Sequence, residues 1–243
     1  MLHPGMGTQK RTLLPQSFRY NVSVFCSLEN GDLNGQHRIG ANGACRLERN
    51  WKGRMGIRIE SMHLGAVAVL VSDVLYDERG HFMETYRADR FRELGLPEVF
   101  VQENQSWSRR GVVRGLHFQW DPPMAKLMRV IVGSAFFVAV DIRKNSPTLG
   151  DWFGIEVSGE NKRQVWAPPG FARGICVASE HAEIQYKCTA LYNPPGESEI
   201  RFDDPALGIE WPSMDGYLLS DKDRNAQTLA EWLAREESSA FQY

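Results

Sequence analysis

The stretch KLMRVIVGSAFFVAVDIR, residues 126–143, contains two short apolar runs with Gly133 and Ser134 between them. Val, Ile and Phe dominate both runs, and β-branched and aromatic residues of this kind are typical of strands. A glycine between two such runs is a turn signal. The stretch therefore predicts two consecutive β-strands.

The same pattern extends in both directions, over residues 65–212, with Gly, Pro, Asn and Asp between the runs. The predicted strands cover residues 66–76, 112–120, 126–133, 135–143, 150–158, 163–170, 172–179 and 182–192. Short strands at a spacing of roughly 8–12 residues favour an antiparallel sandwich or barrel over alternating strands and helices. We expect an all-β fold, with a jelly-roll barrel as the architecture that fits best.

Two helical patches interrupt the strands, at residues 88–96 and 225–237. In the second, Leu229, Trp232 and Leu233 follow helical spacing and should pack one face onto the body. Residues 1–54 show neither helical nor alternating apolar periodicity, which predicts a disordered or non-native extension. We therefore expect an extension over 1–54, a jelly-roll domain over 55–225, and a C-terminal helix and tail over 226–243.

The composition is that of an ordinary globular protein, with 42% hydrophobic and 24% charged residues and a formal net charge of -2. Such a balance gives no global attraction to nucleic acid or anionic membranes, so an anionic ligand needs a local cationic cluster. Cys26, Cys45, Cys176 and Cys188 have no metal-type spacing and are expected to be free thiols. No apolar stretch reaches the ~20 residues of a membrane span. No signal-peptide pattern is present either, and we expect a cytoplasmic protein.

The segment GVVRGLHFQW, residues 111–120, places Arg114, His117 and Gln119 in a strand that should bury apolar area. Strict alternation would put Arg114 and His117 on opposite faces of the sheet. Gly115 lies between them, and one bulge there would bring both onto one face. Such a polar group suits a ligand-binding barrel mouth. The alternative is an edge strand with solvated polar residues.

Three further features add polar candidates to neighbouring predicted strands. Lys126 shares a face with Met128 and Val130, so it is either a lysine that meets an anion or a surface lysine at a strand start. Tyr192 ends a strand, where a structural role is the ordinary explanation. Arg79, Glu84, Gln102 and Asn104 lie between aromatic residues and are explained as turn and rim chemistry.

Several segments together resemble one family of nucleotide-sugar epimerases, the dTDP-4-dehydrorhamnose 3,5-epimerases. They include DERGHFMETY, FVQENQSWSRRGVVRGLHFQ, KLMRVIVG, APPGFARGICVAS, EIQYKCTALYNP and LSDKD, and the resemblance covers about residues 60–225. It implies a cupin-like jelly roll, usually a homodimer, that needs no metal or nicotinamide cofactor. In agreement, His117 is followed by Phe118 and Gln119, so the HxH pair of metal-binding cupins is absent.

Epimerisation beside a ketone removes a proton, holds the charge that moves to the carbonyl oxygen, and returns a proton from the opposite face. The resemblance implies that His117 is the base, Lys126 stabilises the enolate and Tyr192 returns the proton. It also implies that Asp223 orients the histidine, with Asp221 as the alternative in the same turn.

The expected substrate is a dTDP-4-keto-6-deoxy sugar, epimerised at C3, C5 or both, in dTDP-L-rhamnose or related deoxysugar biosynthesis. The residues expected to bind it are Arg79, Phe82, Glu84, Gln102, Asn104, Arg114, Arg173 and Glu197. Arg173 stands where the family ordinarily has histidine, and arginine cannot serve as a base near neutral pH. Three alternatives follow: an epimerase of a single centre in another pathway, a non-catalytic sugar-nucleotide binder, and a metal-dependent cupin oxygenase.

Overall fold

The computed structural model describes residues 38–39, 45–46 and 56–243. Contacts divide the chain into two compact units, Met1–Lys52 and Gly53–Tyr243. In the first unit, β1 (Arg38–Ile39) pairs antiparallel with β2 (Cys45–Arg46). The rest of the predicted extension, and the thiols of Cys26 and Cys45, lie outside the described residues.

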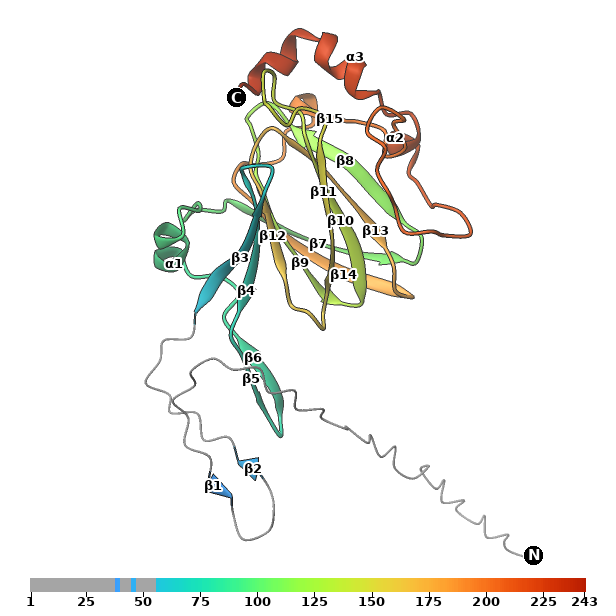
Figure 1. Cartoon of the computed structure of the whole chain (residues 1–243). Coiled ribbons are helices and arrows are strands. Elements are labelled where there is room, and N and C mark those ends of the chain that lie inside the picture. Colours follow the sequence, from blue (N-terminus) through green and yellow to red (C-terminus); the bar gives the residue numbers. More distant parts are fainter. Residues whose placement is uncertain (1–37, 40–44, 47–55) are drawn as a thin grey trace, which may run out of the picture. The chain divides into compact units, whose positions relative to one another are not determined.

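The second unit is built on two antiparallel sheets (Figure 1). The six-stranded sheet has the order β3 (Ile57–His63), β4 (Val67–Ser72), β12 (Gln164–Ala167), β9 (Lys126–Val132), β14 (His181–Cys188), β7 (Gln102–Arg109). The five-stranded sheet has the order β11 (Trp152–Ser158), β10 (Ser134–Asp141), β13 (Phe171–Val177), β8 (Val113–Gln119), β15 (Glu197–Glu199). The expected all-β, cupin-like jelly roll is confirmed.

Each predicted strand segment contains one of these strands, but β3, β7 and β15 were not predicted as strands. The reason is clearest in β7, whose sequence QENQSWSR alternates between partly buried and exposed positions. Its inward positions are occupied by polar residues, from Gln102 to Ser108, rather than by apolar ones. A strand that lines a polar cavity gives no hydrophobic period, so the pattern on which the prediction depended is missing.

The main apolar core lies between the two sheets. It contains fully buried Phe137 and Phe171 from the five-stranded sheet, and Val130 and Ile184 from the six-stranded sheet. A second cluster covers the other face of the six-stranded sheet, where Phe91 of α1 (Ala88–Glu93) packs. Large side chains of this kind contribute ~1.5–3 kcal/mol each on burial.

The C-terminal helical patch is shorter than predicted from residues 225–237. The structure has α3 (Leu229–Ala234) followed by a 3-10 helix, η2 (Glu236–Ala240). The helix begins after Thr228 because that residue and Glu231 form a reciprocal capping box. The predicted apolar face is confirmed: Trp232 is fully buried, and its ring contacts Phe118 of β8 edge to face.

Three small elements complete the architecture and bear on the site. Helix α2 (Asp221–Arg224) lies with α3 at one end of the sandwich (Figure 1), and Ser220 caps it. The hairpin of β5 (Val74–Asp77) and β6 (Gly80–Met83) projects away from both sheets (Figure 1). A 3-10 turn, η1 (Pro194–Gly196), precedes β15. Among the described residues, no helix is long and apolar enough to cross a membrane.

Candidate active site

The predicted bulge in β8 is confirmed. His117 pairs with Arg173 of β13 while Arg114 pairs with Ile175, so between these pairs two residues of β8 lie opposite one residue of β13. Gly115 occupies the bulge with φ 131°. A Cβ there would lie 2.5 Å from Gly174 Cα and 2.7 Å from Arg173 O, which only glycine avoids. Arg114 and His117 consequently line one cleft.

A buried carboxylate holds His117 in place. His117 Nε2 lies 2.6 Å from Asp223 Oδ1, which also accepts a 3.1 Å hydrogen bond from the Gly115 amide of the bulge. Asp223 Oδ2 accepts a 2.6 Å bond from the Ser220 hydroxyl. Burial would raise the pKa of Asp223, but these hydrogen bonds, led by that from His117, lower it to about 2.

The ionised Asp223 selects the tautomer of the histidine. A carboxylate can only accept, so His117 Nε2 must carry the proton that it shares with Asp223. The lone pair of the neutral ring is then on Nδ1, which makes no hydrogen bond to any described residue. His117 lines the cleft, and its Nδ1 is therefore the nitrogen that can accept a proton from a ligand.

The cleft lies between the sheets and has a volume of about 640 Å³. That volume is within the usual range for a small-molecule site. Both sheets and the loop after β14 contribute side chains, and most of these are polar. They are Gln102, Asn104, Gln105, Ser106, Trp107, Arg114, His117, Met124, Lys126, Tyr186, Cys188, Tyr192 and Glu197.

Lys126 supplies a cation at the floor of this cleft. Its Nζ lies 4.8 Å from the centroid of the Tyr186 ring. Burial, with the nearby charge of Arg173, lowers the pKa of Lys126 from 10.5 to about 8. A lysine in this state carries a charge that depends on pH within the neutral to mildly alkaline range.

The rim holds a tyrosine and an acid on the β15 side of the cleft. Tyr192 is half-exposed, and its hydroxyl donates a 2.9 Å hydrogen bond to Glu197 Oε2. The same oxygen accepts a hydrogen bond from Lys222 of α2. The bond to Glu197 raises the pKa of Tyr192. Burial would raise the pKa of Glu197, but the bonds from Lys222 and Tyr192 outweigh it and lower that pKa.

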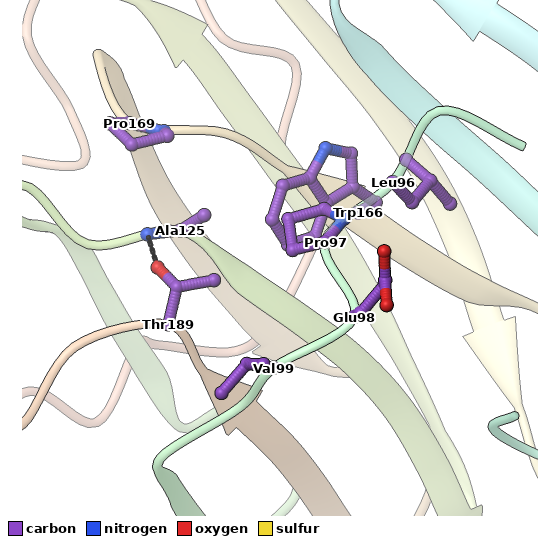
Figure 2. A pocket seen from close by; sticks show the side chains of 8 residues that line it. All are labelled: Leu96, Pro97, Glu98, Val99, Ala125, Trp166, Pro169 and Thr189. Carbon is purple, nitrogen blue, oxygen red and sulfur yellow. Dashed lines mark hydrogen bonds between the residues drawn. The ribbon is translucent and has the colours of Figure 1, made fainter. Parts of the chain in front are cut away.

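A second hollow lies beside the segment that follows α1 and has different chemistry (Figure 2). It is lined by Leu96, Pro97, Glu98, Val99, Ala125, Trp166, Pro169 and Thr189. Its single carboxylate, that of Glu98, is already bound by Arg92. Its lining offers no second titratable side chain to act with Glu98, whereas the cleft around His117 gathers several, so that cleft is the candidate active site.

The comparisons with known proteins agree on one family. The model of the dTDP-4-dehydrorhamnose 3,5-epimerases matches residues 61–231. The chain belongs to this family. A dTDP-4-dehydrorhamnose 3,5-epimerase of Methanothermobacter thermautotrophicus is 49% identical over 170 residues, covering 69% of this chain and 92% of that protein.

Two further similar proteins differ in the number of centres in their names, one a 3,5-epimerase and the other a 3-epimerase. A dTDP-6-deoxy-D-glucose-3,5-epimerase from Legionella pneumophila, solved with dTDP-4-keto-L-rhamnose, is 43% identical with a TM-score of 0.73, over 77% of this chain and 98% of that one. A dTDP-4-dehydrorhamnose 3-epimerase of Streptomyces niveus is 37% identical over 177 residues, covering 72% of this chain and 85% of that protein. The predicted family and enzyme class, an isomerase, are confirmed.

The structure brings together most of the residues that the resemblance to the epimerases indicated. Asp223 contacts His117, whereas Asp221 is exposed. Arg173 is buried behind the lining. The residues that lie in the cleft wall are Gln102, Asn104, Arg114, His117, Lys126, Tyr192 and Glu197.

Three expected substrate-binding residues lie elsewhere in the single chain. Arg79 and Phe82 are on the projecting β5–β6 hairpin, with 90% of the Arg79 side chain exposed and Arg79 paired with Asp77. Glu84 follows the hairpin, and one of its oxygens binds Arg87 at 3.4 Å while Oε1 is buried without a partner. None of the three lines the cleft of its own chain.

Several residues of this epimerase site were not predicted from the sequence. They are the lining residues Gln105, Ser106, Trp107, Met124, Tyr186 and Cys188, and Lys222 beside Glu197. Tyr186 and Lys222 matter most for the chemistry. Tyr186 lines the cleft from β14 and is flanked by buried Ile184 and Cys188 two residues away on either side. That alternation was visible in the sequence EIQYKC and could have identified Tyr186 as inward-facing. Lys222 gave no such signal, because its contact with Glu197 joins a four-residue helix to a distant strand.

Proposed function

We propose that the chain epimerises a dTDP-4-keto-6-deoxy sugar at C3 and C5 through an enolate. His117 Nδ1 takes the proton from the carbon beside the ketone, and the C–H electron pair forms a C=C bond. The carbonyl π pair moves onto the oxygen, which becomes negatively charged. Reprotonation of the carbon from the opposite face inverts the centre and restores the ketone.

The observation that carries this proposal is the His117–Asp223 pair at the wall of a polar cleft. Asp223 is buried, ionised and bonded to Nε2, so it stabilises the imidazolium that forms when the ring accepts a proton. Lys126 is placed at the cleft floor, where an ammonium can hold the enolate oxygen. Arg114, Gln102 and Asn104 provide donors for the nucleotide part of the substrate.

The proton donor has two candidates. Tyr192 is the candidate that the resemblance implied. It lies at the rim, and its hydroxyl donates a hydrogen bond to Glu197 of β15, the strand that pairs with the His117 strand β8. Tyr186 comes from β14, in the sheet opposite β8, and burial raises its pKa. Inversion requires removal and return of the proton on opposite faces of the sugar. We therefore favour Tyr186 as the donor, with Tyr192 shaping the rim.

A second candidate function is inversion of one centre only. Two observations favour it: the similarity to a 3-epimerase, and a large buried arginine, Arg173, directly opposite the base in the β8–β13 pairing. Reaching C3 and C5 in turn requires the sugar to shift against the cleft wall. A wall that resists that shift would restrict the reaction to one carbon.

Solvent deuterium incorporation into dTDP-4-keto-6-deoxyglucose, followed by NMR, tests the proposal. Label at C3 and C5 is the expected result, and label at one carbon identifies the single-centre enzyme. His117→Ala should abolish exchange and leave dTDP binding intact. No label with the wild-type protein, or exchange that survives in His117→Ala, would refute the proposed function.

We also propose that the protein works as a homodimer in the cytoplasm. Arg79 and Phe82 project from the sandwich, exposed and away from their own cleft, as expected of residues that reach into a second copy. Mixed dimers of His117→Ala and Arg79→Ala chains should then contain one intact site each. With random exchange of subunits the mixture recovers about a quarter of wild-type activity. No recovery, or a monomer by light scattering, would contradict the exchange.

A further inference from the structure

The side chain of Arg173 is a buried cation for which the fold provides no acidic partner. The residue is 4% exposed. Its Nη1 donates a 3.0 Å hydrogen bond to the backbone oxygen of Met124, and its Nε has no partner at all. Among residues 56–243 no carboxylate lies within ion-pairing distance of the guanidinium.

Such an arrangement is costly unless the charge has a use. A buried ion is normally paired or loses its charge. Burial lowers the pKa of Arg173 only to about 10, so the guanidinium keeps its proton at neutral pH. The fold therefore maintains a permanent positive charge with a free donor in its interior.

The position of Arg173 directs this charge toward the cleft. In the β8–β13 pairing Arg173 stands opposite His117, and opposite residues of an antiparallel pair project from the same face. Met124, to which it donates, lines the cleft. Five charged or titratable groups from four elements face the pair formed by Arg173 and Lys126. They are His117 of β8, Tyr186 and Cys188 of β14, Glu197 of β15 and Lys222 of α2.

We propose that Arg173 is a positioning residue that supplies the fixed charge of a two-cation site, in which Lys126 contacts the enolate oxygen and Arg173 stabilises the same negative charge from behind the cleft wall. The proposal rests on the proposed function for the identity of the anion. Its consequence is that enolate stabilisation persists when Lys126 loses its proton, because the neutral amine still donates a hydrogen bond and the guanidinium remains charged.

Deuterium exchange measured against pH tests the catalytic part of this proposal. The wild-type rate should change less than about twofold between pH 8 and 9.5, across the titration of Lys126. Arg173→Met should lose roughly tenfold, less than the ~100-fold expected for a donor in direct contact with the oxyanion, because the guanidinium acts from behind the wall. Its remaining activity should fall as Lys126 deprotonates. Arg173→Lys should recover most of the loss, and guanidinium ion should partly rescue Arg173→Ala. A wild-type rate that falls tenfold per pH unit above 8, or an Arg173→Met rate within twofold of wild type, would overturn it.

A measurement without substrate tests the electrostatic part and separates it from the proposed function. The rate of reductive methylation of Lys126, followed by mass spectrometry across pH, reports when its amine is neutral. Removing the charge in Arg173→Met should move this titration to higher pH. Arg129→Met, which alters a half-buried arginine on the opposite face of β9, should leave it unchanged. An unmoved titration would overturn the proposal even if the epimerase activity is present. If the wild-type protein showed no deuterium exchange, the proposed function would be refuted. The methylation titration of Lys126 would still decide whether the charge of Arg173 acts on that lysine.

Discussion

Replacing Asp223 by asparagine tests how much one buried negative charge contributes to the action of His117 as a base. The carboxylate accepts hydrogen bonds from His117 Nε2, the Gly115 amide and the Ser220 hydroxyl, and its pKa falls from 3.8 to about 2. A shift of this size corresponds to ~2.5 kcal/mol in favour of the charged form. Asparagine keeps the shape but loses that charge, and its amide can donate to Nε2 and reverse the tautomer. The imidazolium that forms on proton abstraction then lacks its counter-charge.

We expect the deuterium exchange rate of Asp223→Asn at pH 7 to fall roughly 60-fold or more, the equivalent of ~2.5 kcal/mol in the barrier. The loss should appear in kcat rather than KM, because Asp223 does not line the cleft. Asp221→Asn is the matched control, two residues away on α2 and exposed, and should stay within about twofold of wild type. Equal activity in Asp223→Asn and wild type, or an equal loss in Asp221→Asn, would refute the reasoning.

Further predictions concern the bulge, the acid, the C-terminal helix and pH. Gly115→Ala should destabilise the fold by about 2 kcal/mol or more and slow exchange, since its methyl meets backbone 2.5 Å away; an unchanged Tm would contradict this. Tyr186→Phe should block epimerisation while retaining exchange, and Tyr192→Phe should mainly raise KM; the reverse pattern by NMR would return the acid role to Tyr192. Trp232→Ala should cost ~3–5 kcal/mol in urea unfolding, and a cost below 1 would mean that α3 is dispensable. The depressed pKa of Asp223 predicts a stability contribution that is complete above about pH 4 and lost as pH falls toward 2, so wild type and Asp223→Asn should converge in acid.

The fold was predictable because its signals are local. Eight apolar segments bounded by turn residues predicted strands, and the structure has a strand in each. The bulge was also local, since Gly115 between Arg114 and His117 requires a break in alternation if both are to face the cleft. Strand β7 escaped prediction for a physical reason. Its inward face is polar because a ligand, not apolar packing, satisfies it.

The site depended on the tertiary structure for its partners. Sequence left Asp221 and Asp223 as alternatives, and only the packing of α2 on β8 places Asp223 against His117, 106 residues away in the chain. Tyr186 became a candidate only when the two sheets were seen to face each other across the cleft. The significance of Arg173 likewise depends on the absence of a carboxylate beside it in the described fold, which no local pattern reveals.

The sequence by itself determined the apolar strands, their turns, the family and the residue types available for proton transfer, because periodicity, glycine placement and motif order act over a few neighbouring residues. The tertiary structure decided which of those groups are buried, charged and paired. Charge state and proton direction depend on solvent exclusion and on contacts between distant segments, and both arise only when the two sheets close around the cleft.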